Sequence, residues 1–83
     1  MSSISRELLL MKVKYNKSNR RDIMEVCEIM GARIVDMSKN MMLIQMCDIP
    51  ERIQLFIGMF KSVSIVEVAR TGTLALQKCN ETE

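Results

Sequence analysis

The 83-residue chain contains no histidine and no tryptophan, only one tyrosine and two phenylalanines, one proline and three glycines. Without histidine there is no imidazole base, so these residues cannot build a Ser-His or Cys-His catalytic pair. The three glycines are not spaced as a phosphate-binding loop. Asp22, Glu25 and Glu28 share one helical face, which is more typical of a solvated surface than of an acid–base site. We expect no catalytic residues.

The three cysteines, Cys27, Cys47 and Cys79, are far apart, odd in number and lack CxxC spacing. Together with the absence of histidine, this spacing argues against a structural zinc site or a redox motif. We therefore expect neither a metal nor a cofactor. Cys27 and Cys47 are predicted to be buried and to pack as small hydrophobic residues in a reducing compartment, and Cys79 to be exposed.

The formal net charge is +2, from 12 basic and 10 acidic residues spread through the chain. A nucleic-acid site would require a denser basic stripe, usually with stacking aromatic residues, so we expect no nucleic-acid partner. No apolar stretch is long enough to span a membrane. Residues 1–5 do not resemble a signal or transit peptide and are predicted to be a short leader. These features predict a soluble protein that is not bound to a membrane.

Hydrophobic spacing predicts an alternation of strands and helices. Ile23, Val26, Cys27 and Met30 form an i, i+3, i+4, i+7 stripe, and the same stripe recurs 30 residues later at Ile53, Phe56, Ile57 and Phe60. Ser18 or Asn19 could cap the first helix and Gly31 could end it, while Pro50 suits the first turn of the second helix. The predicted elements are strands at 6–15, 32–37, 41–47 and 63–69, helices near 19–30 and from 48–50 to 60, and a short fifth strand at 73–77.

The order βαββαβ predicts an α+β fold of the ferredoxin-like (ACT-like) kind. Two right-handed split βαβ units give a four-stranded antiparallel sheet with two helices on one face. The expected strand order is 4-1-3-2, with the first and third strands in the centre. One domain is predicted at 6–78, followed by a frayed tail at 79–83.

One face of the sheet must pack under the helices, and alternation assigns the side chains. The predicted core set is Leu9, Met11, Val13, Tyr15, Met42, Ile44, Met46, Val66 and Val68. The opposite, open face then carries Leu8, Leu10, Met41, Leu43 and Ile65. Because a sheet face that meets water should be polar, this apolar set predicts an interaction surface and a two-fold homodimer. The alternative is that Leu74 and Leu76 of the tail cover part of it.

Three segments resemble the C-terminal domain of acetohydroxyacid synthase (acetolactate synthase) small subunits. Arg6-Glu-Leu8 resembles the opening of that domain, and Ala32-Arg-Ile-Val-Asp36 resembles the segment after its first helix. Ile65-Val-Glu-Val-Ala-Arg-Thr-Gly72 is similar to its characteristic end. The last segment is the most specific, and the resemblance covers residues 6 to about 78.

The resemblance implies a non-catalytic regulatory subunit that stimulates a thiamine-diphosphate-dependent catalytic subunit and supports feedback regulation of branched-chain amino-acid biosynthesis. It implies a location in the cytoplasm, or in a plastid if the source is a photosynthetic eukaryote. The amino-acid effector would bind an N-terminal ACT domain that this chain lacks. The alternative is a stand-alone ACT-like amino-acid sensor, against which the glycine-free loop 16–19 argues.

The resemblance also marks Glu67, Arg70, Thr71 and Gly72 as interface candidates. Two interpretations of Arg70 stay open. It could contact another subunit through a bidentate ion pair. It could instead pair with Glu67, or cap a carbonyl, within the same domain. Gly72 is expected to serve backbone geometry.

Overall fold

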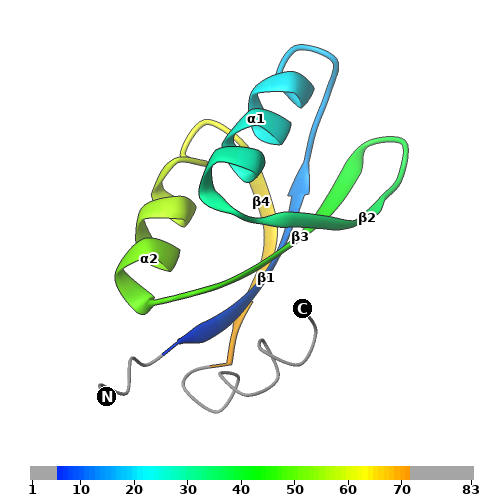
Figure 1. Ribbon diagram of the computed structural model, residues 1–83. Helices are drawn as coiled ribbons and strands as arrows, with labels where there is room; N and C mark the ends of the chain where they lie inside the picture. Colours follow the sequence, from blue (N-terminus) through cyan, green and yellow to red (C-terminus); the bar gives the residue numbers. More distant parts are fainter. Residues whose placement is uncertain (1–5, 72–83) are drawn as a thin grey trace, which may run out of the picture.

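The structure is a computed structural model, and it describes residues 6–71 of the chain. These residues follow the predicted order (Figure 1). The elements are β1 (Glu7–Lys14), α1 (Arg20–Met30), β2 (Arg33–Met37), β3 (Met41–Asp48), α2 (Pro50–Gly58) and β4 (Ser64–Arg70). The predicted leader, fifth strand and frayed tail lie outside the described residues, as do Gly72, Leu74, Leu76 and Cys79.

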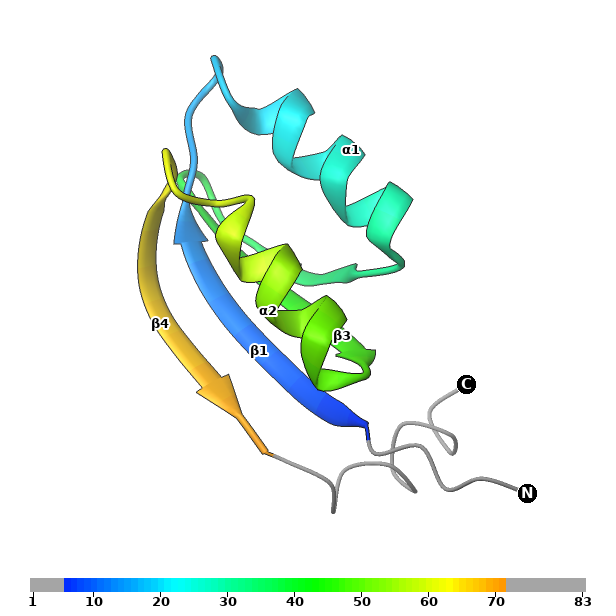
Figure 2. The same cartoon turned by 90° about the vertical axis from the view of Figure 1, so that its left-hand side faces the viewer.

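The sheet is antiparallel with the order β2-β3-β1-β4, which confirms the predicted arrangement with β1 and β3 in the centre. Both helices lie on the same side of the curved sheet (Figure 2). In the central pair, Leu9 is opposite Met46, Met11 is opposite Ile44, and Val13 is opposite Met42. Residues directly opposite one another share a face, so these three pairs form the floor on which the helices pack.

The ends of α1 show how local chemistry sets its length. Asn19 occupies the N-cap position, but its side chain does not bond the helix. Its Oδ1 accepts the Asn16 backbone N–H (2.8 Å), while the Asn19 N–H donates to Asn16 Oδ1 (3.0 Å). This reciprocal pair tightens the turn before the helix. Gly31 ends the helix in a left-handed conformation, with φ of 78°, as predicted for a glycine C-cap.

Asp48 and Pro50 set the start of α2. Pro50 lies at the first helical position, where its missing N–H costs no hydrogen bond. Asp48 accepts the Ile49 backbone N–H at 2.7 Å and pairs with Arg52 Nε at 2.8 Å. A carboxylate beside the first turn also favours the positive end of the helix dipole. The helix therefore begins where β3 ends, with only Ile49 between them.

The core lies between the sheet and the two helices and is almost entirely aliphatic and sulfur-containing. Phe56 and Phe60 are its only buried aromatic residues among those described, with ring centroids 4.9 Å apart. The twelve buried residues are Leu9, Met11, Val13, Ile23, Cys27, Met30, Met42, Ile44, Met46, Ile53, Phe56 and Phe60. Both helical stripes and the strand assignments for β1 and β3 are thus confirmed, with Tyr15 half-buried at the margin.

The edge strand β4 departs from the prediction. A bulge interrupts its pairing with β1, so that Lys12 is opposite Glu67 but Val13 is opposite Ile65, and Val66 is the extra residue. Val68 is opposite Met11 and does face the helix side. It is nevertheless 42% exposed, and all seven residues of β4 are exposed. The prediction that Val66 and Val68 belong to the core is therefore wrong, because α2 packs over β1 and β3 and leaves β4 uncovered.

Candidate interaction surface

The face of the sheet that points away from the helices carries the predicted apolar residues of β1 and β3. Leu8, Leu10, Met41 and Leu43 are all half-buried, and none belongs to the core cluster. We refer to these four residues as the open-face set. Leu8 is opposite Cys47, and Leu10 lies between Gln45 on one side and Ala69 on the other. The alternation in the central strands therefore separates two apolar surfaces, of which the helices cover only one.

Two lysines divide the open face. Lys12 is opposite Leu43 on β3 and opposite Glu67 on β4, and Lys14 is opposite Met41. The aliphatic stems of such lysines can extend apolar surface while the ammonium groups stay in water. A partner surface must therefore contact leucine and methionine side chains and accept ammonium groups at the same time.

Ile65 was expected on this face but lies on the other. Its partner across the ladder is Val13, a core residue, so the bulge at Val66 turns Ile65 toward the helix side. A one-residue change in register exchanges the two faces of a strand. Glu67, on the far side of the bulge, does lie on the open face, opposite Lys12.

Arg70 forms an ion pair within the domain. Its Nε and Nη2 both lie 2.8 Å from Glu7 Oε1, and its Nη1 donates to Gln54 Oε1 at 3.0 Å. The prediction that Arg70 pairs with Glu67 is wrong. Arg70 is opposite Leu9 on the helix side of β4, whereas Glu67 is on the open side. Sequence reasoning missed Glu7 and Gln54, since no local pattern indicates contacts between residues so far apart.

Thr71 extends the pairing of β4 with β1 by one residue. Its backbone N–H donates to the Leu8 carbonyl at 3.1 Å, and the Leu8 N–H donates to Thr71 Oγ1 at 3.3 Å. These bonds tie the end of β4 to the start of the open-face set. The Arg6-Glu-Leu segment and the Ala-Arg-Thr segment, which are distant in sequence, therefore form one structural unit through Glu7–Arg70 and Leu8–Thr71.

The two described cysteines differ in environment. Cys27 is 3% exposed and free, and burial raises the pKa of its thiol from 9.0 to about 11, so the thiol stays protonated at neutral pH. Cys47 was expected to be buried but is half-buried on the open face, since the odd-numbered residues of β3 point away from the helices. Cys27 thus packs as a small hydrophobic residue, as predicted.

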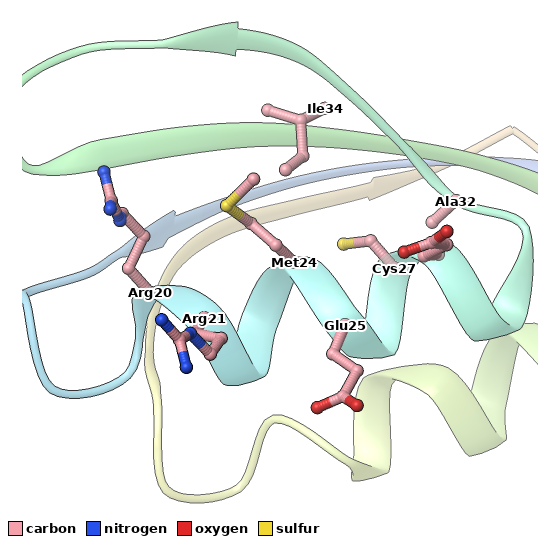
Figure 3. Close-up of a pocket in the computed structure, with 8 residues that line it drawn as sticks. Arg20, Arg21, Met24, Glu25, Cys27, Ala32 and Ile34 are labelled. Carbon is pink, nitrogen blue, oxygen red and sulfur yellow. The ribbon is translucent and has the colours of Figure 1, made fainter.

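A hollow of about 630 Å³ lies between α1 and β2 (Figure 3). Met24 and Cys27 line it from the helix and Ile34 from the strand, while Arg20 reaches toward the sheet layer. Arg21 and Glu25 of α1 also line it (Figure 3). Met24 and Cys27 give the hollow apolar contacts. The Cys27 thiol is not an ionised nucleophile at neutral pH, because burial raises its pKa.

Residues 6–71 contain no group of three or more His, Cys, Asp or Glu residues placed to hold a metal ion. Within the same residues, no helix is long and apolar enough to cross a membrane.

The element order and strand order are those of a ferredoxin-like domain of the ACT-like kind, and its sheet face away from the helices carries four half-buried apolar side chains. The sequence model of the family described as "Small subunit of acetolactate synthase" matches residues 6–79. The chain belongs to this family, which confirms the resemblance drawn from its sequence motifs.

Individual relatives carry the same description. The chain is 35% identical over 80 residues to the probable acetolactate synthase small subunit of Archaeoglobus fulgidus, covering 96% of this chain and 50% of the relative. It is 35% identical over 77 residues to the small subunit of Bacillus subtilis, covering 93% and 45%. It is 33% identical over 75 residues to the chloroplastic small subunit 2 of Arabidopsis thaliana, covering 90% and 16%. The chain thus spans about half the length of the microbial relatives named here, or less.

A solved structure supports the fold. The crystal structure of the acetolactate synthase small subunit from Thermotoga maritima superposes with a TM-score of 0.78 at 28% sequence identity. The match covers 83% of this chain and 42% of the other chain. The βαββαβ sandwich is therefore the fold of one part of that larger subunit.

Proposed function

We propose that this chain acts as a non-catalytic regulatory domain of acetohydroxyacid synthase, in which it binds the catalytic subunit and raises its activity. The observation that carries the proposal is the family match over residues 6–79. The absence of histidine from the sequence fits a role without catalysis of its own. The chemistry, including the thiamine diphosphate, would reside in the catalytic partner, and the setting would be branched-chain amino-acid biosynthesis.

The open-face set supports a further part of the proposal, which is self-association of the chain. Four half-buried apolar side chains on one sheet face favour burial against another surface. We propose that two copies of the chain meet through this face, with Leu8, Leu10, Met41 and Leu43 at the centre. Glu67, on the edge strand, would lie at the rim, where charges favour orientation more than affinity, whereas Lys12 and Lys14 extend from the central strand β1 within the face.

Arg70 has a different role in this proposal. Its guanidinium is already engaged by Glu7 and Gln54, so it holds the end of β4 in place and does not reach a partner. Thr71 acts in the same way through its bonds to Leu8. Among the family-marked residues in the described part of the chain, Glu67 lies on the open face, opposite Lys12.

The test is reconstitution with the catalytic subunit from the same source. We expect the 83-residue chain to co-elute with that subunit and to increase the rate of acetolactate formation. The catalytic subunit alone and a Leu10→Lys/Leu43→Lys variant serve as controls. Neither complex formation nor a change in rate, at concentrations where the wild-type chain is folded, would refute the proposal.

The effector prediction is tested separately. We propose that feedback by an amino acid requires an ACT domain outside this chain. Titration of the isolated chain with valine, leucine and isoleucine in a calorimeter should then give no saturable heat. Micromolar binding would instead support the stand-alone amino-acid sensor.

A further inference from the structure

A second hollow, of about 810 Å³, is lined by the loop after β1 and the hairpin between β2 and β3. Its lining residues are Tyr15, Asn16, Lys17, Arg20, Lys39 and Asn40. We call these six residues the basic basin. The volume lies within the range of sites for small molecules, about 300–1,000 Å³.

The charge of the basin is uncompensated. Lys17, Arg20 and Lys39 line it, and no carboxylate does. The ion pairs of the described residues involve Arg52 with Asp48 and Arg70 with Glu7, so none reaches these three cations. Three positive groups around one hollow repel one another, and an anion placed between them removes that repulsion.

The basin is held in shape by bonds between its two loops. The Tyr15 backbone N–H donates to the Asn40 carbonyl at 2.9 Å, and the Tyr15 hydroxyl donates to the Ser38 carbonyl at 2.6 Å. On the other side, Asn16 and Asn19 bond each other reciprocally, and the Arg20 N–H donates to the Asn16 carbonyl at 3.0 Å. A ligand therefore meets backbone that is already ordered, which lowers the entropy cost of binding.

We propose that the basic basin binds a small anion that carries two or more negative charges on phosphate oxygens. Guanidinium and ammonium groups are the usual partners of phosphate, and the amide groups of Asn16 and Asn40 add neutral donors. A nucleic acid fits less well, because the cationic patch is limited to three residues and its one aromatic ring, Tyr15, is tied to the hairpin through its hydroxyl. The site does not involve the open-face set, so it is separate from the proposed contact between two copies of the chain.

The test uses the 83-residue chain labelled with ¹⁵N and titrated with inorganic pyrophosphate at constant ionic strength. Saturable shifts confined to amides of residues 15–20 and 38–41 are expected. The Lys17→Ala/Lys39→Ala variant should bind about tenfold more weakly, taking roughly threefold for each exposed charge. Lys39→Arg should retain affinity, and Lys61→Ala, which removes an exposed lysine outside the basin, should not change it.

Three outcomes would overturn the proposal. Shifts that never saturate and extend to Lys12, Lys14 and Lys61 would show only general attraction of anions to the surface. Unchanged affinity in the double lysine variant, with its amide spectrum still dispersed, would place binding elsewhere. Succinate binding as tightly as pyrophosphate, or single-stranded RNA binding where pyrophosphate does not, would exclude a small phosphate ligand.

Discussion

Glu7 and Arg70 are 63 positions apart in the sequence and meet at 2.8 Å across the β1–β4 edge of the sheet. Both lie on the helix side of their strands, and the same guanidinium reaches Gln54 on α2. The contact therefore joins the first strand, the last strand and the second helix. It adds a side-chain contact to the backbone ladder that holds the exposed strand β4 against β1.

We predict that Arg70→Lys destabilises the domain by about 1 kcal/mol. Lysine keeps the charge but cannot contact Glu7 and Gln54 at the same time. The estimate is small because the two side chains are 32% and 18% exposed, and solvent screens such pairs. Urea unfolding measures the change, and a double-mutant cycle with Glu7→Gln should give a coupling energy of about 0.5–1 kcal/mol.

Lys61→Gln is the control for the Arg70 experiment, since it alters an exposed cation that has no ion pair among residues 6–71. Its unfolding free energy should stay within about 0.5 kcal/mol of wild type. A coupling energy of zero between positions 7 and 70 would mean that the ion pair does not stabilise the edge.

The two described glycines give a matched pair of substitutions. Gly31 has a positive φ, whereas Gly58 ends α2 without one, and a Cβ at either position would meet nothing within 4 Å. Gly31→Ala should therefore cost about 1 kcal/mol from backbone strain alone. Gly58→Ala should stabilise by about 0.5–1 kcal/mol, because alanine favours the helix and restricts the unfolded chain. Equal effects of the two changes on the unfolding midpoint would contradict the assigned conformations.

The central sheet and both helices could be predicted from sequence because their burial is periodic. In β1, Lys12 and Lys14 mark the face that points away from the helices, and a period of two then separates Leu9, Met11 and Val13 from the other face, as the structure shows. Gln45 marks the same face in β3. The stripes that contain Ile23 and Ile53 identify the helices for the same reason. A helix or strand that buries one side shows a regular spacing of apolar residues, and this spacing can be recognised without knowing which element packs against it.

The edge strand could not be predicted in the same way. The extra residue at Val66 is compatible with the alternating sequence, because valine suits either face, so nothing local indicates the change in register. The pairing of Arg70 with Glu7 depends on that register and on the position of Gln54. The basic basin was also missed, since Lys17 and Lys39 come together only when two loops meet at one end of the sheet.

Stability should depend on pH through Cys27. Burial raises the pKa of its thiol from 9.0 to about 11, so the folded chain holds this proton more tightly than the unfolded chain. The contribution of the protonated Cys27 thiol to the free energy of unfolding is fully present below pH 9.0 and is lost as pH rises through about 11. The loss is on the order of 2–3 kcal/mol, from roughly 1.4 kcal/mol for each unit of pKa.

Cys27→Ala isolates this effect from lysine and tyrosine titration. The variant should be less stable than wild type at neutral pH, because it leaves a small cavity. The difference between the two proteins should then shrink or reverse as pH rises above 9, since only the wild type loses the thiol contribution. A difference that stays constant in urea unfolding across this range would show that Cys27 does not control the alkaline transition.

We predict that substitutions in the open-face set weaken dimerisation of the chain. Leu10 and Leu43 point away from the helices and are half-buried, so a lysine at either position can reach water without disturbing the core. In a dimer formed through this face, the same lysine would bury a charge against leucine and methionine. Leu10→Lys or Leu43→Lys should therefore raise the dimer dissociation constant by at least about tenfold, or 1.4 kcal/mol, while unfolding of the monomer changes less.

Leu55→Lys is the matched control, because Leu55 is a 53% exposed leucine on α2, on the opposite side of the sheet. Light scattering across a range of concentrations should show wild type and Leu55→Lys as dimers where Leu10→Lys has dissociated. A monomeric wild-type chain at micromolar concentration would contradict self-association through this face. If all four proteins instead form equally stable dimers, the contact lies elsewhere, and the uncovered strand β4, with Ile65, Val66 and Val68 exposed, becomes the surface to alter next.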